Sequence, residues 1–474
     1  MASGGAYHSM YKYLLCWRYL RTRYIALASV MSVMLGVATM IVVNSVMAGF
    51  SAKMRDRLHG VLADVVAESY DLDGFSNADE VMARINEVAG AQVEAMAPTM
   101  ETFGLMKIPF PGGKSITRTV QIIGVRPRER ARTGDFAEFL FDHRGRKIEP
   151  SFEVPERLRG ASPAGQILQD LPPDDPFRKE LEEQARQQVP EHGAIVGWAL
   201  ATIHRDGADE FLAPPGTKIG LAFPAAGIKP APAYDDYATI GYFKSGMSEY
   251  DSSHVYVPLE QLQRVRLLVD AQGRGAVNQI QIKVKPGVDL DRLARTIQDG
   301  LERLRPMYFR VSTWEQKQGP LLAAVSVEQG ILNLLLFFII AVAGFGILAI
   351  FSMIVVEKTR DIGVMKALGA SNAGVREIFL GYGLLLGVVG SGVGMLGGLT
   401  FVRYINAIEK GLSRLTGRKV FDDSIYYFNE IPTLVEPWTV FWIVGGALFI
   451  AAAASVWPAQ RAARLHPVKA LRFE

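Results

Sequence analysis

Long apolar segments alternate with long polar stretches along this chain. A helix needs about 20 mostly apolar residues to cross the hydrocarbon core of a bilayer. Four segments meet this requirement, and none has Asp, Glu, Lys or Arg in its interior. They span residues 24–50, 330–356, 379–402 and 437–457. The pattern predicts an α-helical membrane protein with four transmembrane helices.

Basic residues beside these segments predict their orientation, because cytoplasmic loops carry an excess of Lys and Arg. The loop at 403–436 mixes basic with acidic residues, whereas three other flanks are basic. The basic flanks hold Lys12, Arg18, Arg21 and Arg23, then Lys358, Arg360, Lys366 and Arg376, and finally Arg461, Arg464, Lys469 and Arg472. We therefore expect residues 1–23, 357–378 and 458–474 in the cytoplasm, and residues 51–329 and 403–436 outside it.

The first apolar segment also has the basic start of a signal peptide. Its apolar run is too long for one, and no clear A-x-A cleavage site follows it. We therefore treat residues 24–50 as a membrane span.

The large domain between the first two spans has α+β patterning. Strand–helix–strand units are expected at both of its ends, and we expect them to pair into one subdomain. The first comprises Val65–Tyr70, a helix opened by Ser76 with Asp79 in a variant capping box, Val93–Met96 and Glu101–Ile108; the last comprises Val277–Val284, Leu290–Leu304 and Tyr308–Ser312. Thr117–Val125 alternates like a strand after the first unit. A mostly β region then lies between the two units, with strands at Ala194–Val196, Lys218–Phe223, Tyr237–Phe243 and His254–Val257 and a helix at Val257–Leu268.

Two further features of this domain concern its borders and its surface. Ser51–Asp64 and Gln316–Gln329 have helical patterning and are expected to extend the first and second spans as stalks. Residues 142–190 are charged and proline-rich, with a helix expected at Phe177–Gln188 after a favourable cap at Asp175 and Pro176. We interpret this stretch as a surface insertion.

Composition excludes several kinds of chemistry. The net charge of +3 does not suggest a nucleic-acid partner, and the single cysteine, Cys16, cannot form a disulfide within the chain. The absence of charged residues inside the spans argues against an ion-coupled transporter. The driving force is expected to come from another subunit.

No motif in the sequence predicts a nucleotide, metal or nucleophile site. The fragment Gly112–Ser115 looks like part of a phosphate loop, but Ile108 stands where a glycine is needed, so we interpret it as a hairpin turn. None of the seven histidines forms an i, i+4 pair, and no G-x-S-x-G is present. We expect no enzyme activity and no cofactor in this chain.

The third span is rich in glycine at spacings that suit close helix contact. Gly383 and Gly387, and Gly390, Gly394 and Gly398, lie four residues apart. The spacing fits packing against the chain's own helices or against another subunit, and we favour the first.

Several stretches resemble one family of permeases. They are Arg18–Arg23, Val42–Phe50, Gly241–Ser253 with Val257–Glu260, Glu357–Ala370, Tyr426–Pro432, and Pro458–Arg464 with Pro467–Glu474. The chain is identified on these residues as similar to the LolC/LolE group of the MacB-like ABC transporter permeases.

The resemblance implies a machine in the bacterial inner membrane that extracts lipoproteins towards a periplasmic carrier. A pair of permease subunits, identical or different, would sit on separate ATPase subunits that carry ATP and Mg²⁺. Acyl chains would lie between the first and second spans, with contacts from Met40, Val43, Met47, Leu336, Phe337 and Phe338. Ordinary lipid-facing positions also explain these six residues.

The cytoplasmic segment after the second span has an amphipathic pattern that suits a groove on a partner. By resemblance it is the helix that docks on the ATPase, through Arg360, Asp361, Ile362, Met365, Lys366 and Leu368. A helix lying on the membrane surface is the alternative. For the whole chain, the alternatives to lipoprotein release are a MacB-like efflux permease and a regulator that moves an outside domain to control an enzyme.

Overall fold

The computed structural model describes residues 24–110, 114–156, 158, 190–205, 208–227, 231–306, 308–416 and 430–466. It divides into two compact units, and each is described by itself. The helical unit contains the residues up to Lys53 and most of those from Leu321 onward, and the sheet unit consists mainly of Met54–Pro320.

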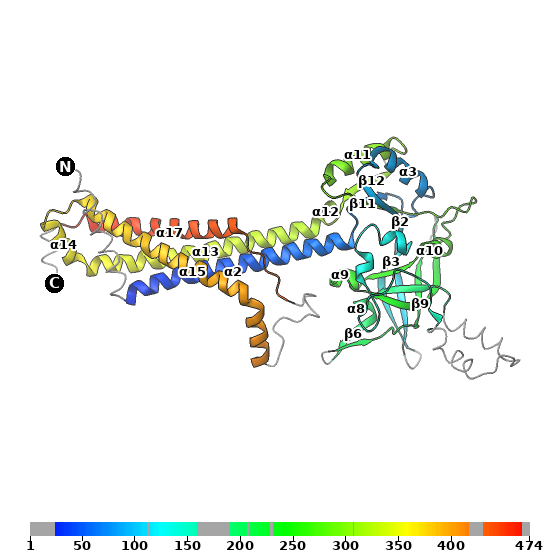
Figure 1. Ribbon diagram of the computed structural model, residues 1–474, viewed down its shortest axis with the longest axis horizontal. Coiled ribbons are helices and arrows are strands. Elements are labelled where there is room, and N and C mark those ends of the chain that lie inside the picture. Colours follow the sequence, from blue (N-terminus) through cyan, green and yellow to red (C-terminus); the bar gives the residue numbers. More distant parts are fainter. Residues whose placement is uncertain are drawn as a thin grey trace. The chain divides into compact units, whose positions relative to one another are not determined.

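Within the described residues, four long helices dominate the helical unit (Figure 1). Each contains a stretch long and apolar enough to cross a membrane. Their bounds are α2 (Tyr24–Val61), α13 (Gly319–Glu357), α15 (Asn372–Thr416) and α17 (Pro437–Ala463). This confirms the predicted fold class, with four transmembrane helices and a large α+β domain between the first and second.

The stalk helices predicted next to the membrane are continuous with the spans. α2 runs on past residue 50 to Val61, and α13 begins at Gly319, well before residue 330. The second boundary differs from the prediction, because Gln316 belongs to a separate short helix, α12 (Trp314–Lys317). Pro320 is the second residue of α13, where the missing N–H of proline costs no helical hydrogen bond.

The glycines of α15 allow close packing against two other helices of the chain. A Cβ at Gly383 or Gly387 would collide with Ser455 or Ala451 of α17. A Cβ at Gly394 would lie 2.6 Å from the carbonyl oxygen of Met34 on α2, and Gly390 and Gly398 face the same helix. The glycine-rich span therefore packs within its own chain, as we favoured.

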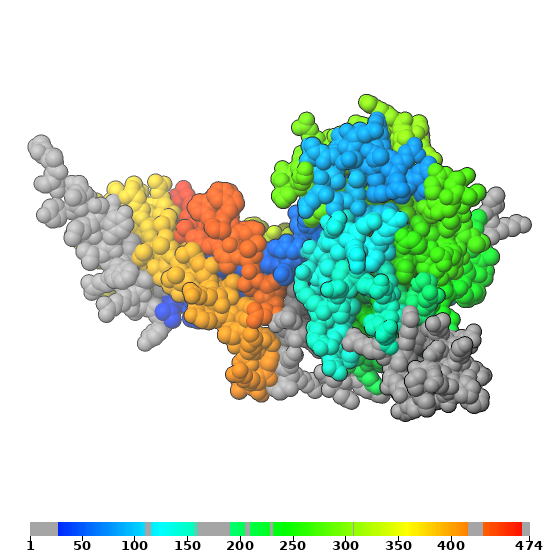
Figure 2. All heavy atoms as spheres, turned by 45° about the vertical axis from the view of Figure 1, so that its right-hand side comes forward, coloured from blue at the N-terminus to red at the C-terminus, as the bar shows by residue number. Residues whose placement is uncertain are grey.

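The two strand–helix–strand units form one half of the sheet unit. The strands lie in the order β12 (Phe309–Thr313), β1 (Val65–Ser69), β11 (Gln279–Val284) and β2 (Val93–Phe110), all antiparallel to their neighbours. Helices α3 (Ala78–Ala89) and α11 (Leu290–Glu302) supply apolar side chains to the core that these strands share. In Figure 2, α3 (blue) lies directly beside the β2–β3 strands (cyan). The predicted pairing of these units is confirmed.

Two local expectations in this half are wrong. α3 begins at Ala78 with Asn77 at the cap position and no side-chain cap hydrogen bond, so Ser76 does not open it. β2 is one strand and not two: its pairing with β11 ends at Thr99, where pairing with β3 begins. The Asn278 side chain then bonds both the N–H and the C=O of Glu101, which extends the backbone pairing of β2 past the end of β11.

The other half of the sheet unit is a closed ring of six strands. β2 pairs with β3 (Lys114–Val125), β3 with β10 (His254–Pro258), β10 with β5 (Gly193–Gly197) and β5 with β9 (Pro232–Phe243). β8 (Lys218–Pro224) pairs with both β9 and β2 and closes the ring. Met106, Ile122, Val196, Leu221 and Tyr242 are among the buried core side chains of these strands. Closure of a small barrel removes exposed strand edges, and side chains fill its interior.

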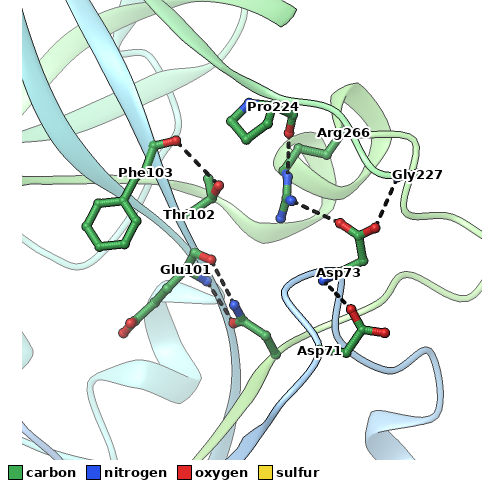
Figure 3. Close-up of polar contacts among 9 residues, drawn as sticks. Asp71, Asp73, Glu101, Thr102, Phe103, Pro224, Gly227 and Arg266 are labelled. Carbon is green, nitrogen blue, oxygen red and sulfur yellow. Dashed lines mark hydrogen bonds and ion pairs between the residues drawn. The ribbon is translucent and has the colours of Figure 1, made fainter. Parts of the chain in front are cut away.

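Arg266 joins the two halves of the sheet unit (Figure 3). It follows α10 (Leu259–Val265), which is shorter than the predicted helix at Val257–Leu268. Its buried guanidinium donates to the carbonyl oxygen of Pro224 at 3.0 Å and to Asp73 at 3.3 Å. Asp73 also accepts from the N–H of Gly227 at 3.0 Å. The Arg266 side chain thereby connects the end of α10 to the end of β8 and to the turn that contains Asp73.

Two sequence-based expectations touch residues outside the described ranges. Most of the 142–190 insertion, including the predicted helix at Phe177–Gln188, lies outside them. Residues 111–113 do too, but Phe110 pairs with Lys114 in antiparallel register, as a hairpin requires. Lys114 and Ser115, from the fragment that looked like part of a phosphate loop, are strand residues.

The glycine contacts predict a difference between two similar substitutions on α15. Gly394→Ala places a methyl against the Met34 carbonyl, whereas a Cβ on Gly397 would have nothing within 4 Å. Overpacking of the first kind costs about 1–3 kcal/mol. We expect Gly394→Ala to lower the unfolding midpoint of the purified protein in detergent, and Gly397→Ala to leave it unchanged or raise it. Equal midpoints for the two variants would contradict the packing described.

Candidate functional site

The residues expected to contact acyl chains lie in different environments on α2 and α13. Met40, Val43 and Met47 of α2 are half-buried, and Met40 packs against a core cluster from α2, α13 and α17. Leu336 of α13 is buried, but Phe337 and Phe338 are 54% and 56% exposed. Of the six, only these two phenylalanines present most of their surface outward.

The space between α2, α13 and α17 is small. Gly36 of α2 lies close to Ile340 of α13, and the cavity beside them measures about 10 Å³ with an entirely apolar lining that includes Val37 and Gly344. Such a volume holds about one water molecule. This cavity is therefore too small to hold an acyl chain.

A short segment after the third span, residues 431–434, contacts both α15 and α2. The Asn406 side chain of α15 bonds both the N–H and the C=O of Ile431. The N–H of Leu434 donates to the carbonyl oxygen of Ser45 on α2 at 2.8 Å, and a Cβ on Gly49 would lie 2.6 Å from Pro432. Sequence reasoning missed Asn406, although the small residues Ser45 and Gly49 were a signal for close approach.

The short helix α14 (Thr359–Ala367), between the second and third spans, buries part of the face predicted to dock on a partner. Ile362 is fully buried in a cluster with Phe351, Phe379 and Ala459, and Met365 packs against the same cluster. Lys366 donates to the carbonyl oxygens of Ala463 and Leu465 at 2.6 and 2.7 Å. A cation there bonds the carbonyl of the last residue of α17 and one just beyond it, and it interacts well with the helix dipole.

The outer face of α14 is formed by other side chains. Arg360, Asp361, Val364 and Leu368 are exposed, and Leu368 is 83% exposed. Gly369 follows with a φ of +97°, which ends the helix in the left-handed conformation that glycine favours. Sequence reasoning missed Val364, because an amphipathic pattern does not say which apolar stripe faces the chain's own helices.

The end of α2 is held in the sheet unit by a buried arginine and an aspartate. Arg130 donates to the carbonyl oxygen of Val61 at 2.6 Å. Asp64 accepts hydrogen bonds from His59 at 2.5 Å and from the N–H of Val284 at 2.7 Å. Burial raises the pKa of Asp64, but these two bonds and the charge of Lys283 outweigh burial and hold that pKa below its usual value.

The chain returns towards α13 beside the same aspartate. β1 and β12 are antiparallel neighbours with Val65 opposite Thr313, and the N–H of Trp314 donates to the carbonyl oxygen of Asp64 at 3.1 Å. The Trp314 ring stacks on His59 with 5.0 Å between ring centroids. We call this arrangement of His59, Asp64 and Trp314 the joint. It brings together the points at which both connections to the spans leave the sheet unit.

Among the residues that the structure describes, no group of three His, Cys, Asp or Glu side chains is placed to bind a metal ion. The candidate functional surfaces are therefore the outer faces of α2, α13 and α14 and the joint.

Two protein-family models match this chain. The family model described as the MacB-like periplasmic core domain matches residues 26–299, and that described as the FtsX-like permease C-terminal matches residues 333–467. The chain is 25% identical to the lipoprotein-releasing system transmembrane protein LolC of Xylella fastidiosa over 96% of this chain and 97% of the relative.

Two other relatives are matched to different extents. LolE of Haemophilus influenzae is 22% identical over 97% of this chain and 98% of its own length. The macrolide export ATP-binding/permease protein MacB of Bdellovibrio bacteriovorus is 27% identical over 43% of this chain and 29% of its own length. The resemblance inferred from sequence motifs is thus confirmed, and the chain belongs to the MacB-like periplasmic core domain family, as a permease subunit of an ABC transporter.

Proposed function

We propose that this permease uses ATP hydrolysis on a separate ATPase subunit to extract lipoproteins from the bacterial inner membrane towards a periplasmic carrier. The observation that carries the proposal is the similarity to LolC over nearly the full length of both chains. A second permease subunit, identical or different, completes the transporter. ATP and Mg²⁺ bind the partner ATPase, and both termini of this chain lie in the cytoplasm.

The packing around α14 supports transmission from the ATPase to the spans. Ile362 inserts into a cluster built by Phe351 of α13, Phe379 of α15 and Ala462 of α17. Protein interiors are close-packed, so a displacement of α14 moves its neighbours. A partner that pushes on α14 therefore acts on three spans at once.

The exposed apolar surface of α13 supports the proposal that acyl chains bind on the outside of this subunit. The cavity beside Gly36 and Ile340 is about 10 Å³, far too small for an acyl chain. Phe337 and Phe338 offer exposed apolar surface on α13. An acyl chain held against these rings is enclosed only when another surface, such as the second permease subunit, covers it.

Efflux of a small molecule and control of an outside enzyme are the competing functions. The MacB relative favours efflux, but it is matched over only 43% of this chain. Neither alternative requires a lipid-anchored cargo at α13.

Docking on the ATPase predicts a loss of complex formation when the outer face of α14 is charged. Leu368→Asp should reduce co-purification of the ATPase subunit about tenfold or more, because an apolar anchor at an interface centre is lost. Leu415→Asp is the matched control, since Leu415 is 86% exposed on α15. Met365 is a poorer test because its side chain packs against the core. Equal recovery of the ATPase with both variants would argue that α14 lies on the membrane surface instead.

Lipoprotein extraction predicts contact between acyl chains and α13. A photo-crosslinking amino acid at Phe337 should capture a lipid-anchored protein several-fold more often than the same group at Phe449, which is 74% exposed on α17. A cargo variant without its lipidated cysteine should abolish the product. Crosslinks that are equal at both positions, or that persist without the lipid, would count against lipoprotein release.

A further inference from the structure

The segment from Ser245 to Asp251 folds into a closed loop around one buried carboxylate. Asp251 accepts from the N–H and the hydroxyl of Ser245, both at 2.8 Å, and from the N–H of Gly246 at 3.1 Å. Gly246 has a φ of +73°, which favours glycine. The loop includes the short helix α9 (Ser248–Asp251) and leads into barrel strand β10.

This loop contacts both chain segments that connect the sheet unit to the spans. Arg57, near the end of α2, donates to the carbonyl oxygen of Gly246 at 2.5 Å. Gln318, which ends α12 directly before α13, donates to the Tyr250 hydroxyl at 2.8 Å. A Cβ on Gly246 would collide with the Arg57 guanidinium. The two contacts come from one rigid loop.

Tyr250 carries the contact inward to the barrel. Its ring is buried and meets the ring of His254 edge-on, with 4.8 Å between centroids. His254 is the first residue of β10, and its Nδ1 lies 3.4 Å from the hydroxyl of Tyr256 on the same strand. A push on Gln318 therefore reaches a barrel strand through packed aromatic rings.

These contacts give each stalk a second attachment point. The joint holds the end of α2 through His59 and the returning chain through Trp314. Arg57 lies about one helical turn before Val61, the last residue of α2, and Gln318 lies four residues after Trp314. A helix attached to a domain at one point can tilt without moving that domain. A helix attached at two points moves the domain when it tilts.

We infer that the loop Ser245–Asp251 is a clamp that makes the barrel follow the tilt of α2 and α13, with Arg57, Tyr250 and Gln318 as positioning residues. This inference rests on the proposed function, because it concerns how motion of the spans reaches the domain that handles cargo. Arg57 and Gln318 act through the loop and touch no substrate.

Two tyrosines of the sheet unit offer a matched test. Tyr250→Phe removes the acceptor of Gln318. Tyr242→Phe also removes one hydrogen bond of a buried tyrosine, the one to the carbonyl oxygen of Ala213 at 2.8 Å, but Tyr242 contacts neither stalk through that bond. The two variants are expected to lower the unfolding midpoint to a similar degree.

The first measurement is the amount of lipoprotein released per ATP hydrolysed, with the permease and its ATPase in proteoliposomes. We expect Tyr250→Phe to lower this ratio about threefold or more, and Tyr242→Phe to keep it near the wild-type value. Gln318→Ala should lower the ratio as much as Tyr250→Phe, and the double variant no further. Equal ratios for Tyr250→Phe and Tyr242→Phe would overturn the inference.

The second measurement does not depend on the cargo. Amide hydrogen exchange of residues 245–258 is compared with and without a nonhydrolysable ATP analogue on the same complex. The clamp predicts a nucleotide-dependent change in this segment that Tyr250→Phe removes and Tyr242→Phe keeps. If wild-type protein releases no lipoprotein but this pattern appears, the proposed function fails and the clamp stands. If both variants keep the nucleotide-dependent change, the clamp is rejected whatever the cargo.

Discussion

The pairing of β1 with β12 is the constraint on which the rest of the molecule depends. Val65 and Thr313 are far apart in the sequence, yet they lie opposite each other in adjacent strands. Asp64 stands directly before this pair, and its carboxylate and carbonyl hold Val284, His59 and Trp314. Because the sheet fixes both exits at one place, the helices that follow from them share a common anchor in the sheet unit.

Tight packing serves the same purpose among the spans. Gly394 brings α15 against the backbone of α2, and Gly387 brings it against Ala451 of α17. Apolar side chains gain little from leaving lipid, so close backbone approach is the main source of stability between such helices. Ile362 adds α14 to the same packed body. The spans are therefore suited to respond together and not one at a time.

Local pattern predicted much of this fold and little of the candidate sites. Apolar length alone located the spans, and alternation located the strands. The barrel closes because β8 pairs with both β2 and β9, and such non-local pairing leaves no mark on any one segment. Ile362 and Met365 look like docking residues in isolation because the apolar stripe of α14 is real, but it faces the chain's own core. Arg57 and Gln318 carried no signal, since their partners lie far away in sequence.

The two helices that leave the joint are also well suited to carry motion. Sharp bends in helices occur mostly at proline or at inserted polar groups. α2 has no proline over Tyr24–Val61, and the one proline of α13, Pro320, lies at its second position, where it is tolerated. α17, whose whole length belongs to the helical unit, contains Pro458 within the helix. The uninterrupted lengths of α2 and α13 suit the proposed clamp, in which a tilt of the spans becomes a movement of the barrel.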